Sequence, residues 1–252
     1  MMRTLVSALI GFASGIASGA FGIGGALLST PGIRWILDAP ALVAVGTTLP
    51  VIIPTALTGV YTYARSRLID VRTAAVLCTS GAVFAVLGAL VTQVVPGELL
   101  LVLTAVLIFF LSLRMLRPDK SPHGPRADTS VPVLLVVGTV SGFVSGLLGV
   151  GGGVILVPVL TVLLHFPVKI ALGTSLAVVA AQSIPGSVTH AIIGNIDWGI
   201  VGGLLIGVVP GAHIGSRAAV TVEDAKLRTV VGVAMALLAL AFGAGELRNL
   251  VG

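Results

Sequence analysis

Charged side chains are scarce in this sequence of 252 residues: only 9% are Asp, Glu, Lys or Arg, against about 25% in a soluble domain. Too little polar surface remains to face water on every side, which excludes an ordinary soluble fold. By contrast, 56% of the residues are hydrophobic and the mean hydropathy is +1.15. The composition predicts an all-α polytopic membrane protein.

Cysteine and clustered acidic residues are also nearly absent. The single cysteine, Cys78, lies within an apolar run, so the chain alone offers neither a disulfide framework nor a thiolate metal site. The apolar runs contain no Asp or Glu cluster, no HExxH-type pair and no Cys–His nucleophile pairing. We therefore expect no cofactor, no metal and no enzymatic activity.

The formal net charge of +5 comes from basic residues that stand singly or in small groups between long apolar runs. This pattern is typical of loops that face anionic membrane lipid. It argues against nucleic acid as a partner.

An internal repeat runs through the sequence at a constant offset of 127 residues, without gaps. The aligned residues include Gly15 with Gly142, Pro31 with Pro158, and Asp70 with Asp197. A single register held over such a length indicates a duplicated unit.

Charge-free apolar runs divide both halves in the same way. The later runs suit single membrane spans of roughly 17 to 25 residues: 41–64, 73–95 and 99–113 in the first half, and 170–196, 198–216 and 229–245 in the second. The first run of each half, 4–33 or 131–164, is too long for one span and too short for two. Glycine-rich breaks at 22–25 and 149–153 favour a broken helix or a re-entrant hairpin there, with one long kinked helix as the alternative.

Basic residues favour the hairpin. With returning hairpins, eleven of the fourteen Lys and Arg lie on one face, and only Arg3, Arg34 and Arg248 lie on the other. The positive-inside rule makes the first face cytoplasmic and places both termini outside. Loops at matched repeat positions also differ in charge, since 65–72 is basic and 195–198 contains no basic residue. Loops that differ in this way are expected on opposite sides of the membrane, which predicts two inverted repeats.

We therefore expect three regions: a first membrane repeat at 1–116, a cytoplasmic linker rich in proline and charge at 117–130, and a second membrane repeat at 131–252. The N-terminal stretch resembles a signal peptide. It also carries half of the duplicated motif, so we expect it to stay in the mature protein.

The glycine breaks are the first candidates for chemistry. Without a Cβ, their backbone N–H groups can approach a ligand closely, and the following helix begins there with its positive end. Two such ends near the bilayer centre predict a site for a small anion, although close helix packing also uses small residues. The candidate residues are Gly22, Gly24, Gly25, Ala26, Gly149, Gly151, Gly152 and Gly153.

Hydroxyl side chains occupy matched positions in the next run of each half. Thr47 and Thr48, with Thr174 and Ser175, either donate to the oxygens of a bound anion or bond back to the preceding helical turn.

Three further polar residues lie within apolar runs of the second half. Gln182, eight residues before His190, shares a helix face with it and is a candidate substrate ligand. His190 and His213 are candidates for a coupling proton, or else neutral hydrogen-bonded residues.

Charged residues at the ends of runs have simpler interpretations. Asp70 and Asp197 share one repeat position immediately before apolar runs, which predicts helix N-caps. Arg65 and Arg67 border the second run, where they anchor to lipid or draw anions to the cytoplasmic mouth.

The duplicated motif resembles the TauE/SafE family of sulfite and organosulfonate exporters, also described as TSUP transporters. The resemblance rests on Gly15-x3-Gly19-x2-Gly22-x-Gly24-Gly25-x5-Pro31, its copy Gly142-x3-Gly146-x2-Gly149-x-Gly151-Gly152-Gly153-x4-Pro158, and the segments Gly173-Thr174-Ser175 and Gly194-Asn195-Ile196-Asp197-Trp198. The copies differ where Ala26 matches Gly153 and where Thr48 matches Ser175, so the first break is expected to contact a ligand less closely.

The resemblance implies a secondary transporter, with export favoured, of sulfite, an organosulfonate or a related small anion across the inner membrane. The substrate is expected between the two breaks and to change sides by alternating access, driven by a proton or the membrane potential. Uptake of such an anion and a passive anion channel are the alternatives, and a homodimer is one candidate assembly.

Overall fold

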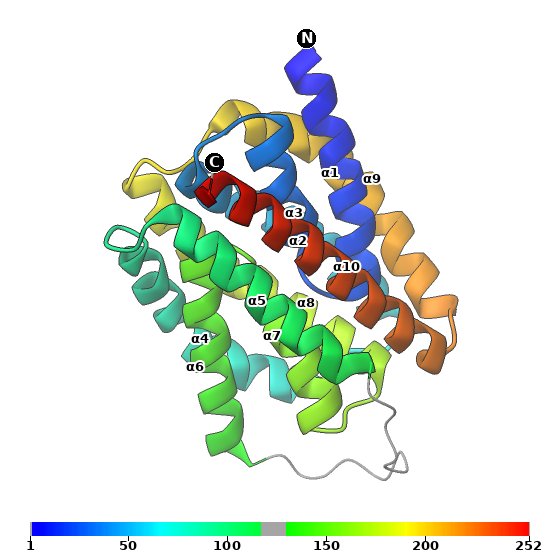
Figure 1. The fold of residues 1–252 in the computed structure, drawn as a ribbon. Helices are drawn as coiled ribbons and strands as arrows, with labels where there is room; N and C mark the ends of the chain where they lie inside the picture. The colour runs from blue at the N-terminus through cyan, green and yellow to red at the C-terminus, as the bar shows by residue number, and fades with distance from the viewer. Residues whose placement is uncertain (1, 117–129, 252) are drawn as a thin grey trace.

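The computed structural model describes residues 2–116 and 130–251, and the regular structure in these residues is helical throughout (Figure 1). The predicted linker at 117–130 falls outside the described residues except for Ser130, the N-cap residue of α6.

The helices of the two halves follow one another in the same order. The first half contains α1 (Met2–Phe21), α2 (Ala26–Pro31), the π-helical turn η1 (Gly32–Ile36), α3 (Ala41–Arg65), α4 (Val71–Val91) and α5 (Gly97–Leu116). The second contains α6 (Val131–Leu148), α7 (Gly153–Pro158), the π-helical turn η2 (Val159–Leu163), α8 (Val168–Ile192), α9 (Trp198–Thr221) and α10 (Asp224–Val251).

Seven helices in the described part of the chain are long and apolar enough to cross a membrane: α1, α3, α4, α5, α6, α8 and α9. This confirms the prediction of an all-helical polytopic protein. The predicted run at 229–245 lies within α10, which is longer than expected and is not one of the seven.

Both long first runs are broken where the glycines predicted. α1 ends at Phe21 and α2 begins at Ala26, while α6 ends at Leu148 and α7 begins at Gly153. After the first break the chain turns back along α1, because Gly25 lies against Ser14 and Ser18. Gly32 in turn lies against the side chain of Ile10, so the single long kinked helix does not form.

Glycine surfaces hold the first helix of each half against a helix of the other half. A Cβ at Gly15 of α1 would overlap the carbonyl oxygen of Val208 in α9. In the same way, a Cβ at Gly142 of α6 would overlap the carbonyl oxygen of Gly81 in α4. α1 therefore packs backbone to backbone on α9, and α6 on α4, as small residues allow within a membrane.

α3 and α8 bury the largest shares of their residues among the seven spans, which places them at the centre of the helix bundle. They contact each other, and α8 also packs on α4 as α3 packs on α9. The glycine breaks at the ends of α1 and α6 are thereby brought against the middle of α3 and α8.

The two matched aspartates cap helices as predicted. Asp70 Oδ1 accepts from the backbone N of Thr73 at 2.9 Å, at the start of α4. Asp197 Oδ1 accepts from the backbone N of Gly199 and Ile200 at 2.9 and 3.0 Å, at the start of α9. Each cap satisfies backbone donors that the first helical turn leaves without a partner.

Candidate functional site

Each break is built from glycines in left-handed backbone conformations that side chains disfavour. In the first break φ is +71° at Gly22, +80° at Gly24 and +85° at Gly25. The second repeats this pattern, with +65° at Gly149, +76° at Gly151 and +68° at Gly152. The repeated glycines are therefore required for the sharp turn between the two helices of each hairpin.

The two breaks meet inside the protein. A Cβ at Gly153 would lie 2.7 Å from Ile23 Cα and 2.8 Å from Gly22 O, so the second break touches the backbone of the first. Gly24 and Gly151 both lie against Ile52 of α3 and Val179 of α8. The predicted candidates of the two halves thus form one cluster, and all of them are buried.

Ile52 and Val179 cover this cluster. They occupy the same repeat position and expose 1% and 0% of their surface. The sequence does not distinguish them from their neighbours, because an apolar residue in an apolar helix carries no signal of its own. In this conformation the two side chains close the space beside Gly24 and Gly151.

Within the described part of the chain, backbone donors at the breaks have no acceptor. Over the described residues, the N–H groups of Gly24, Gly25, Gly151 and Gly152 form no hydrogen bond. α2 and α7 begin immediately after them and continue into η1 and η2, so the positive ends of two helical segments lie in the same region. Buried donors of this kind usually have a protein, water or ligand acceptor.

Side chains with unused polar atoms surround the breaks. Ser14 and Ser18 lie beside Gly25, and Gln182 Oε1 lies 2.8 Å from where a Cβ would stand at Gly152. Gln182 Nε2 donates to Ser141 Oγ at 3.1 Å, which holds the amide in place. Among the described residues the buried side-chain atoms without a partner include Ser14 Oγ, Ser18 Oγ, Ser145 Oγ, Gln182 Oε1 and Ser183 Oγ.

The four predicted hydroxyls separate into two roles. Thr174 Oγ1 accepts from the backbone N of Asp70, and Thr47 Oγ1 accepts from that of Asp197, both at 2.9 Å. These matched bonds attach each central helix to a loop of the other half.

The other two hydroxyls differ between the halves. Ser175 Oγ donates to Gly22 O at 2.9 Å and so reaches the first break. Its counterpart Thr48 instead donates back to Ala44 O at 2.8 Å and lies 3.2 Å from Thr30 Oγ1. Of the four, Ser175 contacts the glycine cluster directly.

His190 is buried beside α6. Its Nε2 lies 3.1 Å from Gly146 O, and its Nδ1 has no partner within the described chain. Tyr63, its counterpart in the first half, donates from its hydroxyl to Gly19 O at 3.2 Å. The 127-residue offset pairs these two positions, but the residue types differ, so identities between the halves do not reveal the pair.

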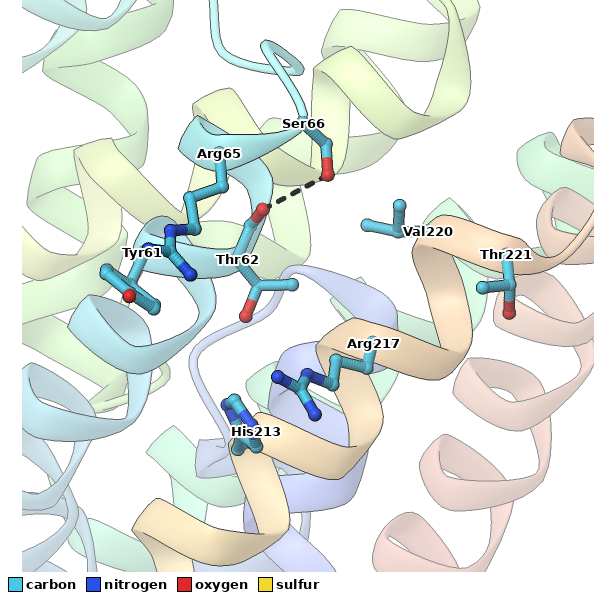
Figure 2. A pocket seen from close by; sticks show the side chains of 8 residues that line it. All are labelled: Tyr61, Thr62, Arg65, Ser66, His213, Arg217, Val220 and Thr221. Atoms are coloured by element: carbon cyan, nitrogen blue, oxygen red, sulfur yellow. Dashed lines mark hydrogen bonds between the residues drawn. The ribbon is translucent and has the colours of Figure 1, made fainter.

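His213 lies apart from the breaks. It lines a pocket between α3 and α9 together with Arg65, as Figure 2 shows. No group of three or more His, Cys, Asp or Glu suited to a metal ion occurs in the part of the chain that the structure describes.

Comparison with known proteins places these features in a family. The model of the family described as sulfite exporter TauE/SafE matches residues 7–242. The "Probable membrane transporter protein YunE" of Bacillus subtilis is 26% identical over 214 residues, covering 75% of this chain and 78% of that protein. The "Probable membrane transporter protein MJ0441" of Methanocaldococcus jannaschii is 30% identical over 192 residues, covering 72% and 70%.

No solved structure matches the chain significantly. The family model nevertheless spans nearly all of it and includes both glycine breaks. The chain therefore belongs to the TauE/SafE sulfite exporter family, a family of membrane transporters and not of enzymes.

Proposed function

We propose that this transporter exports a small sulfur-containing anion, such as sulfite or an organosulfonate, across the inner membrane, and binds it between the two glycine breaks. The observation that carries the proposal is the meeting of the breaks with unused N–H groups at Gly24, Gly25, Gly151 and Gly152. Four buried donors in one cluster suit the oxygens of a single anion.

The polar side chains support an oxyanion as the ligand. In the described part of the chain, Ser14, Ser18 and Ser145 each have a hydroxyl without a partner that is available to donate. Such neutral donors stabilise the negative charge of an oxyanion through hydrogen bonds. Because no ion pair forms, the anion can be released as well as bound. The family description directs the choice towards sulfite and related sulfur oxyanions.

Contacts between the halves support inverted repeats. Thr47, near the start of α3, bonds the loop that follows α8, and Thr174, near the start of α8, bonds the loop that follows α3. α3 and α8 therefore run in opposite directions although they share one repeat position. Rocking of one half against the other would expose the cluster to each side in turn.

The closed centre favours a transporter over a passive channel. A channel needs a continuous wet path, whereas Ile52 and Val179 cover Gly24 and Gly151. A coupling proton on His190 stays a prediction, supported by its buried Nδ1, which has no partner among the residues that the structure describes.

Flux measurements test the function. Purified protein would be placed in oxygen-free liposomes loaded with unlabelled sulfite, and the entry of [³⁵S]sulfite from outside would be followed. We expect saturable counterflow, with competition by the preferred substrate among sulfite, thiosulfate, sulfoacetate, taurine, sulfate and carboxylates. Linear, non-saturating flux would indicate a channel, and no flux of any of these anions would contradict the proposed function.

Cysteine labelling tests the topology. Ser66 and Ile193 occupy the same repeat position, and Cys78 can be removed as C78S. In that background we expect S66C to react with an impermeant maleimide from the cytoplasmic side and I193C from the outside. Labelling of both from one side would rule out inverted repeats.

A further inference from the structure

A pocket of about 320 Å³ opens between the last turns of α3 and the second half of α9 (Figure 2). α3 contributes Tyr61, Thr62 and Arg65, and α9 contributes His213 and Arg217. The pocket is separate from the buried glycine cluster, and it opens at the protein surface, where both arginines are exposed.

Its two arginines are not neutralised. Arg65 Cζ lies 4.9 Å from the centre of the Tyr61 ring, a cation–π contact that holds the guanidinium at one side of the pocket. Arg217 follows His213 by one helical turn on the opposite wall, as Figure 2 shows. Neither arginine forms an ion pair with a carboxylate in the described part of the chain.

The repeat shows that the fold does not need this charge. The matched positions of the other half lie on α8 and α4, which pack together as α3 and α9 do. The counterparts of Arg65, Arg217 and His213 are all apolar: Ile192, Leu90 and Val86. The matched helix contact therefore has no basic residue at these three positions, so the basic pocket is not a repeated feature of the fold.

Polar contacts lead from the pocket towards the first break. Ser216 Oγ, fully buried, donates to Thr62 Oγ1 of the pocket wall at 2.9 Å. The next residue of α3, Tyr63, donates to Gly19 O at 3.2 Å. Gly19 lies three residues before Gly22, so the pocket is next to the α1 end of the glycine cluster.

The geometry points to an oxyanion-binding vestibule in this pocket, in which Arg65 and Arg217 hold the anion and His213 and Thr62 add hydrogen bonds. A guanidinium donates two parallel N–H groups, which suits an oxyanion. A free sulfur oxyanion and the phosphate of a lipid headgroup share this chemistry. The inference that the vestibule supplies anions to the central site rests on the proposed function. The inference that the pocket binds an oxyanion is independent of it.

The position of the vestibule fits loading for export. It lies at the ends of α3 and α9, and α10 begins three residues after Thr221. Arg228 of α10 donates to Met115 O of α5 at 3.1 Å, which places the end of α5 on the same face. This is the face predicted to be cytoplasmic.

Equilibrium binding tests the site without requiring transport. Scintillation-proximity measurements with [³⁵S]sulfite on delipidated protein in detergent would compare wild type with R65Q/R217Q. We expect the variant to lose the weaker, salt-sensitive component of binding and to keep the component due to the glycine cluster. In liposomes we expect its KM for sulfite to rise about tenfold at low salt, because a basic cleft raises the local anion concentration, with the maximal rate unchanged.

R72Q/R114Q is the matched control. It removes two exposed arginines from the same face, and Arg114 also stacks on an aromatic ring, with Cζ 5.7 Å from the centre of Phe110. We expect this variant to keep wild-type binding and KM. Equal losses in both variants would reduce the effect to general surface charge and overturn the vestibule.

Two further arms separate the remaining outcomes. Native mass spectrometry with added phosphatidylglycerol reports the lipid source: retention by wild type but not by R65Q/R217Q assigns the site to a headgroup phosphate. If wild type transports no anion tested, the proposed function fails, while a loss of [³⁵S]sulfite binding confined to R65Q/R217Q still supports the vestibule. Unchanged sulfite and lipid binding in R65Q/R217Q would overturn it and leave the central site untouched.

Discussion

Tyr63 and His190 make equivalent hydrogen bonds in the two halves of the protein. The Tyr63 hydroxyl donates to Gly19 O at 3.2 Å, and His190 Nε2 lies 3.1 Å from Gly146 O. Both bonds attach a central helix to the last turn before a glycine break. Histidine can accept a proton on its second ring nitrogen and tyrosine cannot, so the halves share a contact but not its proton chemistry.

We predict that H190Q retains anion binding but loses the dependence of transport on a pH gradient. Glutamine still offers an N–H to Gly146 O but cannot carry a proton. Sulfite flux with and without an imposed gradient measures the effect. Y63F, which removes the matched bond without touching a titratable group in this pH range, is the control. Gradient-driven flux in H190Q equal to that of wild type would leave His190 with a structural role only.

The contact between the breaks gives a second prediction. In G153A the new methyl group meets the backbone at Ile23 and Gly22, at 2.7 and 2.8 Å. The two breaks must move apart, and overpacking of this kind costs about 1–3 kcal/mol. We expect lower thermal stability and weaker sulfite binding. The converse change, A26G, adds no atoms and should leave binding close to that of wild type. Wild-type affinity in G153A would argue against a shared site.

Thr47 and Thr174 lead to a third prediction, concerning stability. Each accepts a hydrogen bond at 2.9 Å from the backbone N of an aspartate in the opposite half. T174V keeps the side-chain shape but leaves the Asp70 N–H without its acceptor. We expect the free energy of unfolding to fall by about 1–3 kcal/mol, measured by thermal unfolding in detergent. T174S restores the hydroxyl and should restore most of the stability. An unchanged melting temperature in T174V would contradict this role.

Ile52 and Val179 give a fourth prediction, about the closed centre. I52A/V179A truncates both side chains that cover Gly24 and Gly151. We expect a leak, seen as an added non-saturating component of [³⁵S]sulfite flux, because these two side chains supply the nearest atoms to both glycines. The Ile52 change alone should cost about 2–5 kcal/mol of stability, so folding must be verified by size-exclusion chromatography. L49A, another buried residue of α3, controls for lost packing. Flux that remains saturable in the folded double variant would contradict a covering role.

The sequence was sufficient to predict the helical fold and its two interruptions. Long apolar runs without charge have few alternatives to helix, and glycines at 22–25 and 149–153 left no comparable place for the breaks. Asp70 and Asp197 were predictable as N-caps because capping depends on the adjacent turn alone. These features are local and need no knowledge of what lies beside them.

Contacts between the halves were not predictable from the sequence. Two of these contacts depend on α3 and α9 being neighbours in space: the hydrogen bond between Thr47 and the backbone of Asp197, and the pocket shared by Arg65 and Arg217. Identical residues defined the repeat, so the sequence indicated His190 without its counterpart Tyr63 and gave no sign of the pair Ile52 and Val179. Comparing the chemistry of matched positions, rather than their identity, would have found both pairs.

The first helix of each half packs on a helix of the other half, α1 on α9 and α6 on α4, and this has a consequence for biosynthesis. α1 is synthesised well before α9, the helix that fits its glycine surface and that ends only at Thr221. Until α9 is inserted, α1 lies in the bilayer without its packing partner, where it is exposed to mispairing or proteolysis. When α6 is inserted, its packing partner α4 is already in the membrane, so the second half assembles against helices of the first half.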